Sequence, residues 1–390
     1  RHAILQNSSD IHVEPTDKEV VVRYRIDGIL HDAMVLPRQI ASGIVARIKV
    51  LSNLRLDEHR LPQDGRFKLE TPEYRYSFRV SVLPVYDGEK IVMRLLSESS
   101  KGFSLEVLGF RGKALEFIHG AIRKTTGMVL STGPTGSGKT TTLYTILDML
   151  NNPGVNISTI EDPIEYRIPR INQTQVKPDI GLSFANGLRS LLRQDPDVLM
   201  VGEIRDNETA SLAINASLTG HLVLSTLHTN SAAGALPRLI DMKIEPFLIA
   251  TTVNVIIAQR LVRKLCQPHE TYTMNSDQER ALRKDVDLDR LMDVFKKERL
   301  MKTNATWSSL QWSRAKESVD CPDGYRGRVG IYEVLPVSDA IKELIIKNAT
   351  ADEIEAQARK EGMVVVLEDG FIKALEGLTS VEEVFRVASE

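Results

Sequence analysis

The chain has 390 residues, more than one compact core usually serves, so we expect two or three domains. Hydrophobic residues make up 42% of it and charged residues 26%, which excludes a disordered chain and is typical of a globular protein. The 50 basic and 52 acidic residues leave a formal net charge of -2, which argues against a general attraction to nucleic acid.

The first residues, 1–5, lack an initiator Met and do not resemble a signal peptide, so we expect a piece of a longer chain. The longest fairly apolar stretch, residues 247–258, is too short to span a bilayer. Two cysteines, Cys266 and Cys321, make no disulfide framework. We therefore predict a reducing cytosol as the location.

Residues 1–98 are predicted to form a small α/β domain. A strand at 19–26, an Asp-Gly turn and a returning strand at 29–34 indicate a hairpin. Apolar residues at helical spacing predict a helix over 39–54. Further strands are predicted over 66–70, 74–83 and 89–96. In the middle one, Arg79 alternates with core residues, and periodicity alone favours a solvated face.

Residues 99–104 have the composition of a linker, and 105–262 then alternate between helix and strand. That alternation predicts a mostly parallel sheet flanked by helices. The expected strands are 127–131, 155–160, 197–201 and 221–225. The expected helices are 113–123, 141–150, 183–193, 207–218 and 232–240.

The composition of the chain changes after residue 262. Residues 263–332 are expected to form a separate subdomain, with charged surface helices and loop over 267–320 and a turn-rich basic stretch over 321–328. Residues 333–390 are expected to form a helical carboxy-terminal subdomain. Its helices are predicted over 340–347, 351–361 and 367–375, with a last one beginning in a capping box at Ser380.

A phosphate-binding loop lies between the strand at 127–131 and the helix at 141–150. The residues Gly133, Pro134, Thr135, Gly136, Ser137, Gly138, Lys139 and Thr140 fit G-x-x-x-x-G-K-[ST] without a mismatch. Glycines let the backbone wrap an anion, and the helix N-terminus adds positive potential. We expect Lys139 to reach the β- and γ-phosphates and the Thr140 hydroxyl to bind magnesium.

Carboxylates follow two of the predicted strands, where ligands collect in a parallel sheet. Glu203 ends the strand at 197–201 and is predicted to hold magnesium through water. Glu161, Asp162 and Glu165 follow the strand at 155–160, and one of them is expected to orient the attacking water. The residues alone do not separate Glu161 from Glu165. His228, after the strand at 221–225, is a candidate sensor of the γ-phosphate or of a neighbouring subunit.

Four motifs in this order, GPTGSGKTTT, IEDPIE, MVGEIRD and STLHTN, resemble those of the bacterial type II secretion and type IV pilus assembly ATPases. The resemblance extends upstream to SDIHVEP, RYRIDG and RLPQDGR and downstream to GYRGRVGIYE, so it covers nearly the whole chain. It implies a RecA-like P-loop core, preceded by a PAS-like α/β domain and followed by a helical subdomain.

The resemblance also implies roles for individual residues. It makes Glu165 the general base, Glu203 the magnesium residue, His228 the histidine-box residue and Lys139 the phosphate ligand, with Thr141 next to it. Family members bring arginines to the nucleotide from the amino-terminal domain and from core helices. The matching positions are Arg79, Arg94, Arg189, Arg193, Arg205 and Arg238.

The sequence departs from the family at a zinc module with four cysteines. Cys266, His269 and Cys321 are the candidate ligands that remain, one short of the four that structural zinc takes. Asp320 or Asp323 would have to supply the fourth, so we expect the subdomain to stand without metal.

We therefore predict a homohexameric motor that hydrolyses ATP with Mg²⁺ to power pilus extension or secretion-pseudopilus assembly. Movement of the amino-terminal domain against the core would transmit the energy. The expected partner is an inner-membrane platform protein, with no specific nucleic acid. The expected location is cytoplasmic, at the inner face of the membrane.

Two alternatives stay open. A DNA-uptake or conjugative-type secretion ATPase shares the core and would show DNA-stimulated hydrolysis. A non-hydrolysing scaffold would bind ATP tightly and release no phosphate.

Overall fold

The computed structural model describes residues 1–71, 74–97, 103–301, 305–319 and 321–388. Backbone packing divides the chain into two compact units. The amino-terminal unit contains residues 1–101 together with the short segment Glu165–Ile168, and the core unit contains 102–164 and 169–390. Most of the predicted linker, 99–104, lies outside the described residues.

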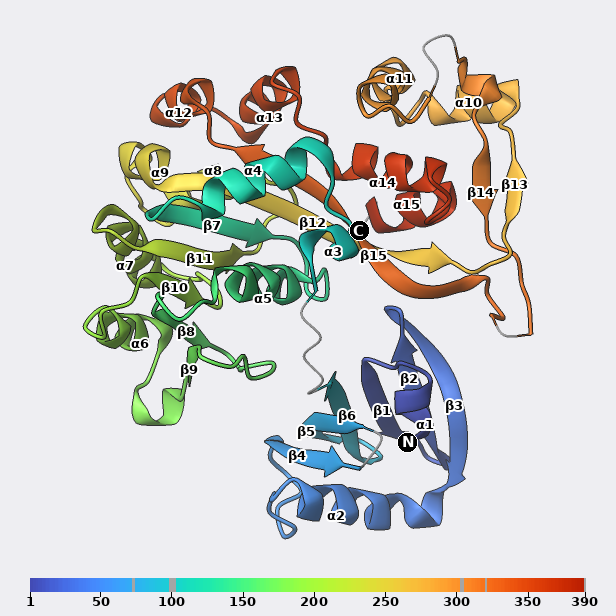
Figure 1. Ribbon diagram of the computed structural model, residues 1–390. Helices are drawn as coiled ribbons and strands as arrows, with labels where there is room; N and C mark the ends of the chain where they lie inside the picture. Colours follow the sequence, from blue (N-terminus) through green and yellow to red (C-terminus); the bar gives the residue numbers. More distant parts are fainter. Residues whose placement is uncertain (72–73, 98–102, 302–304, 320, 389–390) are drawn as a thin grey trace. The chain divides into compact units, whose positions relative to one another are not determined.

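The amino-terminal unit is one antiparallel sheet with a helix packed on it (Figure 1). The strand order is β3-β2-β1-β6-β5-β4. Val45 and Ile48 of the helix share a core with Val80 and Val82 of β5, whose Arg79 is exposed, so the predicted alternation is confirmed. The elements are α1 (His2–Leu5), β1 (Asp10–Pro15), β2 (Glu19–Ile26), β3 (Ile29–Pro37), η1 (Arg38–Ile40), α2 (Ala41–Leu51), β4 (Gln63–Glu70), β5 (Arg75–Val85) and β6 (Gly88–Ser97).

The core unit is built on a sheet in the order β15-β12-β7-β11-β10-β8-β9, flanked by helices (Figure 1). All neighbours are parallel except β12 and β15. The strands β7, β8, β10 and β11 are buried along their whole length, as central parallel strands are. The strands are β7 (Gly127–Thr132), β8 (Ile157–Glu161), β9 (Asn172–Gln175), β10 (Val198–Val201), β11 (Leu222–Leu227), β12 (Val253–Leu265) and β15 (Tyr325–Pro336).

The predicted mixed α/β class with a parallel, helix-flanked core is confirmed, and the predicted helices lie within a few residues of the observed ones. Around the sheet these are α3 (Leu105–Leu108), α4 (Gly112–Ile122), α5 (Lys139–Leu150), η2 (Pro178–Ile180), α6 (Phe184–Leu191), α7 (Asn207–Leu218), α8 (Ala235–Asp241) and α9 (Pro246–Thr252). At the carboxy-terminal end they are α12 (Asp339–Ile346), α13 (Ala351–Lys360), α14 (Val366–Leu375) and α15 (Val381–Ala388). Ser380 Oγ accepts from the Glu383 N–H at 3.2 Å, as the predicted cap requires.

The long strands β12 and β15 run out of the core sheet toward a small outer layer (Figure 1). That layer contains β13 (Glu270–Tyr272), α10 (Ser276–Leu282), α11 (Leu288–Lys297), η3 (Trp307–Ser309) and β14 (Trp312–Arg314). The predicted subdomain boundaries after residues 262 and 332 therefore fall inside β12 and β15. A second hydrophobic core joins the layer to α14 and α15, and within it Phe295, Trp307 and Trp312 are in ring contact.

Sequence reasoning missed six strands: β1, β9, β12, β13, β14 and β15. The strand β1 lies in the SDIHVEP motif. The strand β12 begins inside the apolar stretch 247–258, which the sequence analysis considers only as a membrane span. The stretch read as turn-rich at 325–328 opens β15. This stretch is extended because it continues the pairing of residues 329–335 with β12, and those residues are buried throughout.

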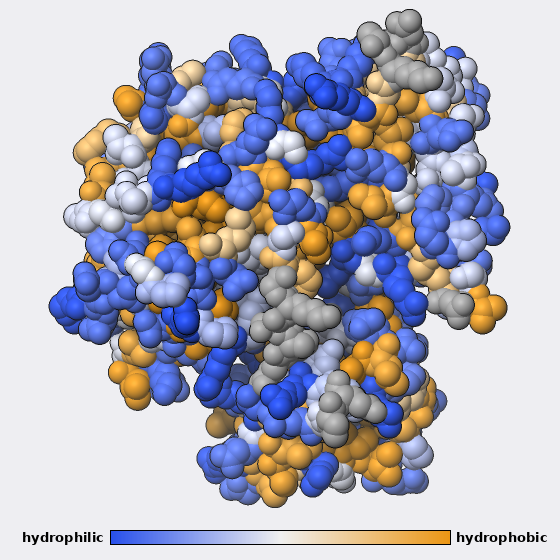
Figure 2. Space-filling model, viewed as in Figure 1, coloured by the Kyte–Doolittle hydropathy of each residue, from blue (hydrophilic) through white to orange (hydrophobic). Residues whose placement is uncertain are grey.

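On the face seen in Figure 2, polar side chains cover much of both units, and apolar side chains gather in separate patches. Within the described residues, no helix is both long and apolar enough to cross a membrane.

Candidate functional site

The predicted phosphate loop joins the end of β7 to the start of α5. Gly133 has a φ of 141°, and a Cβ there would lie 2.5 Å from the backbone oxygen of Gln259. Gly138 has a φ of 91° and immediately precedes the first helical residue, Lys139. Both positions need glycine, one for space and both for their left-handed backbone. The exposed loop residues are Pro134, Thr135 and Gly136, while Ser137 is buried.

Lys139 folds back over the loop that precedes it. Its Nζ donates to the backbone oxygens of Gly133 at 2.8 Å and Pro134 at 2.9 Å. Burial lowers the pKa of Lys139, the nearby Glu203 carboxylate acts against this, and Arg260 adds to it. The Lys139 ammonium therefore lies beside the loop. A phosphate bound there would compete with the Gly133 and Pro134 oxygens for its hydrogen bonds. Thr140 and Thr141, in the first turn of α5, are half-buried.

Glu203, Arg205 and His228 lie together where β10 and β11 end. Arg205 Nε donates to Glu203 Oε2 at 2.6 Å, and His228 Nε2 lies 3.4 Å from the same oxygen. The Glu203 side chain is only 12% exposed, whereas the other two side chains are more than half exposed. The sequence did not predict the pairing of Arg205 with the carboxylate two residues before it.

The His228 segment is fastened to the end of β7. Thr132 Oγ1 lies 2.7 Å from Thr229 Oγ1 and accepts from the Thr229 N–H at 2.8 Å. One strand further along the sheet, Thr226 Oγ1 donates to the Gly202 oxygen at 2.7 Å. These bonds join the end of β7, which leads into the phosphate loop, to the ends of β10 and β11, which lead to Glu203 and His228.

Glu161 and Glu165 have different surroundings. Glu161 is 2% exposed, and its carboxylate accepts hydrogen bonds from the Tyr144 and Thr159 hydroxyls and from Gln173 Nε2. Glu165 packs with the amino-terminal unit. Burial raises the pKa of Glu165, and the positive charges of Arg94 and Arg79 act in the opposite direction. The hydrogen bonds of the Glu161 carboxylate are thus made inside the fold. This favours Glu165 over Glu161 as the residue that orients the attacking water.

Four of the six candidate arginines belong to the core unit, where Arg205 pairs with Glu203. Arg189 of α6 donates to Asn186 and pairs with Glu208 of α7, and Arg193 Nη1 donates to the Arg189 oxygen at 3.0 Å. Arg238 is exposed on α8.

In the amino-terminal unit, Arg79 and Arg94 are direct partners across β5 and β6, and both are exposed. Arg94 Nε donates to Asp10 Oδ1 at 2.9 Å.

The described candidate zinc ligands do not form a metal site, and the prediction that the two cysteines make no disulfide is wrong. Cys266 and Cys321 form a disulfide that bridges 55 positions of sequence. Two of the three candidate ligands are thereby removed as thiolates, and His269 Nδ1 lies 3.0 Å from Gln267 Nε2. Among the described residues, no group of three or more His, Cys, Asp or Glu side chains is placed to hold a metal.

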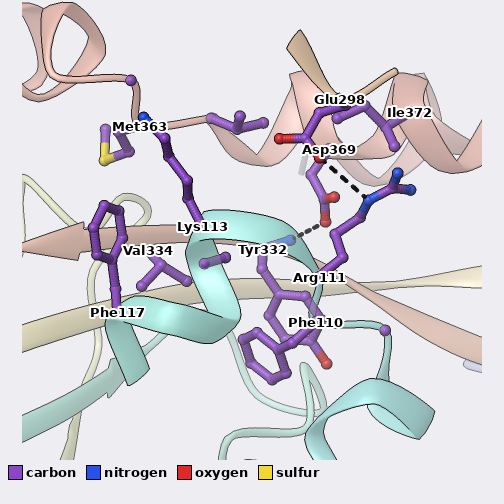
Figure 3. A pocket seen from close by; sticks show the side chains of 14 residues that line it. Phe110, Arg111, Lys113, Phe117, Glu298, Tyr332, Val334, Met363, Asp369 and Ile372 are labelled. Carbon is purple, nitrogen blue, oxygen red and sulfur yellow. Dashed lines mark hydrogen bonds and ion pairs between the residues drawn. The ribbon is translucent and has the colours of Figure 1, made fainter. Parts of the chain in front are cut away.

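A cavity of about 40 Å³ lies beside α4 and is lined by none of the predicted site residues (Figure 3). Tyr332 stacks on Phe110 with ring centroids 3.6 Å apart, and its hydroxyl donates to the Leu108 oxygen at 3.0 Å. Its backbone N–H donates to Asp369 (Figure 3). Burial and Asp369 raise the pKa of the Tyr332 phenol, and the Thr142 hydroxyl of α5 lowers it. Tyr332 thus lines the cavity and also interacts with Thr142 of α5, although none of the described α5 residues lines the cavity.

Comparison with known proteins gives a family over nearly the whole chain. The family model described as "Type II/IV secretion system protein" matches residues 1–386. The type IV pilus assembly ATPase PilB of Myxococcus xanthus is 46% identical over 384 residues, 98% of this chain and 65% of that protein. The type II secretion system protein E of Xanthomonas campestris is 45% identical over 391 residues, 100% of this chain and 66% of that protein. The chain thus spans just under two thirds of these relatives.

Two solved structures share the fold. The pilus retraction motor PilT with bound ADP superposes with a TM-score of 0.65 at 26% identity, over 99% of this chain and 94% of that one. The ATPase DotB of Yersinia pseudotuberculosis superposes with a TM-score of 0.70 at 20% identity, over 99% and 91%. These likenesses support the predicted RecA-like secretion-ATPase fold.

Proposed function

The chain belongs to the type II/IV secretion system protein family, and from that premise we propose that it hydrolyses ATP as a motor for pilus extension or secretion-pseudopilus assembly. The observation that carries the proposal is the shared edge of the core sheet. There the phosphate loop, Lys139, and the Glu203, Arg205 and His228 cluster all lie at the ends of neighbouring parallel strands. Ligands of such sheets bind at that edge.

ATP would lie with its phosphates on the loop and its γ-phosphate facing Lys139. Lys139 would exchange the Gly133 and Pro134 oxygens for phosphate oxygens, which offer full negative charge instead of partial charge. Glu165 would orient the attacking water, because the carboxylate of Glu161 is already bonded on the inside of the fold. His228 would sense the γ-phosphate through its contact with Glu203.

Magnesium fits the oxygen ligands at this edge. In the described part of the chain, no group of three or more His, Cys, Asp or Glu side chains is placed to hold a metal, and Mg²⁺ characteristically takes phosphate and water oxygens for most of its shell. The Thr140 hydroxyl would bind it directly and Glu203 through water. When bound, it would neutralise charge on the phosphates.

The amino-terminal unit would bring Arg79 and Arg94 to the nucleotide. Arg79 and Arg94 lie directly opposite each other on an exposed sheet face, and Asp10 already pairs with Arg94; an anion that contacts both arginines would further reduce their repulsion. Their delivery by a separate compact unit would couple hydrolysis to domain movement. Six copies in a ring, docked on an inner-membrane platform protein at the cytoplasmic face, would turn that movement into filament assembly.

The test is phosphate release by the purified chain with ATP and Mg²⁺. We expect activity in the parent and its loss in Lys139→Ala and Glu203→Gln, with Lys264→Ala, an exposed lysine of β12, as a matched control. Full activity in Lys139→Ala would refute the site. A parent that binds ATP and releases no phosphate would mark a scaffold, and native mass spectrometry would show whether six copies assemble.

A further inference from the structure

Gln259 of β12 holds the phosphate loop from behind. Its amide Nε2 donates to the Ser137 backbone oxygen at 2.7 Å. Its Oε1 accepts from Thr142 Oγ1 at 2.9 Å and Ser131 Oγ at 3.2 Å. The side chain is 1% exposed and spans three consecutive parts of the site: the end of β7, the loop and the first turns of α5.

The orientation of this amide is dictated by its partners. The Ser137 oxygen can only accept a hydrogen bond, so the amide nitrogen must face it. The amide oxygen is then left with two lone pairs for two hydroxyl donors, Ser131 and Thr142. Leucine or methionine here would leave all three buried groups without that partner, and such groups cost free energy when unsatisfied.

Gln259 also occupies the space that two loop glycines leave open. A Cβ at Gly133 would lie 2.5 Å from the Gln259 backbone oxygen, and a Cβ at Gly138 would lie 3.1 Å from Nε2. The glycine pattern of the loop is therefore matched to this one residue, through its main chain at one position and its side chain at the other.

The bond to Ser137 sets the direction of one loop N–H. The Ser137–Gly138 peptide is planar and trans, so its C=O and N–H point in opposite directions. With the oxygen fastened to Gln259, the Gly138 N–H must point away from β12. We infer that Gln259 is a positioning residue that presents the Gly138 N–H, and the loop around it, to the phosphates of the nucleotide.

This inference rests on the proposed function and is tested in the full chain by the split between KM and kcat for ATP. Methionine matches the volume of glutamine and makes none of its hydrogen bonds. We expect Gln259→Met to raise KM for ATP about tenfold, the loss of roughly one to two net hydrogen bonds, while kcat stays within about threefold. Binding of ADP with Mg²⁺, measured by calorimetry, should weaken by the same factor.

The control is Ile257→Ala, two residues earlier on the same face of β12 and fully buried. It should lower the melting temperature without moving KM, because it creates a cavity and touches no loop hydrogen bond. A purely structural role for Gln259 would likewise lower stability and the active fraction at unchanged KM. A folded Gln259→Met protein with parental KM and ADP affinity overturns the inference.

Should Gln259→Met not fold, Gln259→Glu takes its place at pH 8. Glutamate has the size of glutamine and keeps an oxygen that accepts from both hydroxyls. Its second carboxylate oxygen would face the Ser137 backbone oxygen, where the amide nitrogen now donates a hydrogen bond. Parental ADP affinity in that variant overturns the inference equally. A parent chain that binds no nucleotide instead refutes the proposed function, so the two failures are distinguishable.

Discussion

Arg205 Nε and Glu203 Oε2 are joined by a 2.6 Å hydrogen bond, so the carboxylate expected to serve magnesium carries its own counter-charge. Magnesium and Arg205 must compete for it. We predict that Arg205→Ala lowers the Mg²⁺ concentration for half-maximal ATP hydrolysis several-fold, while kcat falls because the family resemblance also assigns Arg205 a contact with the nucleotide. A Mg²⁺ titration at saturating ATP measures both. Arg283→Ala, an arginine of the outer layer, should change neither.

Glu161 and Glu165 are separated by their surroundings, and activity should separate them too. We predict that Glu165→Gln lowers kcat by about 10²–10⁴-fold with ADP binding retained, as expected for loss of a general base. Glu161→Gln should mainly destabilise the fold, because it disrupts a buried carboxylate with three hydrogen-bond donors. Steady-state kinetics and thermal melts of both variants decide this. A larger loss of kcat per folded molecule in Glu161→Gln would reverse the assignment.

Gly133 and Gly120 form a matched pair. Gly133→Ala places a Cβ 2.5 Å from the Gln259 oxygen at a φ of 141°, so we expect loss of ATP binding. Gly120 lies exposed inside α4 with no atom within 4 Å of its would-be Cβ. Gly120→Ala should stabilise the protein by roughly 0.5–1 kcal/mol. Chemical denaturation and ADP titration of both variants give the answer, and normal ADP affinity in Gly133→Ala would contradict the loop geometry.

Glu333 predicts a pH dependence of stability. Burial raises its pKa from 4.5 to about 7, against the hydrogen bond that it accepts from the Ala232 N–H at 2.8 Å. The folded state therefore favours the protonated form. The stabilisation of the fold by protonated Glu333 is complete below pH 4.5 and is lost as the pH rises from 4.5 to about 7. Above about pH 7 the effect of this group on the free energy of unfolding no longer changes with pH. The change amounts to about 3 kcal/mol.

The measurement is urea denaturation of parent and Glu333→Gln between pH 4.5 and 8. Because other groups titrate in the same range, the difference between the two proteins carries the information. It should grow across the window in favour of the glutamine variant and level off above pH 7. A difference independent of pH would contradict the raised pKa.

Lys373 and Asp369 form a buried pair, and Asp369 lines the cavity of Figure 3. Lys373 Nζ also donates to the Gly330 oxygen at 2.6 Å. Lys373→Met leaves the Asp369 charge buried and should lower the free energy of unfolding by about 3–5 kcal/mol. Lys373→Met combined with Asp369→Asn should lose less, because no unpaired charge remains. Equal losses in the single and double variants would show that the pair is not coupled.

The parts predicted from sequence are those encoded over a few neighbouring residues. The phosphate loop needs glycine, lysine and threonine within eight positions, and apolar runs of three or four residues mark the buried strands β7, β10 and β11. The strand β12 was missed because its apolar run was weighed only as a membrane span. Gln259 was missed for the same reason. Its sequence signal is a single amide residue directly after the apolar residues 255–258.

The sequence by itself determined the class of fold, the phosphate loop and the family resemblance, because each is carried by local backbone chemistry and residue order. Only the tertiary structure decided which distant side chains meet. The strand order places β12 beside β7, which brings Gln259 to hydroxyls 117 and 128 residues away. It likewise joined Cys266 to Cys321 and buried Glu161 among donors. Such contacts depend on which strands become neighbours, and residue spacing along the chain does not contain that information.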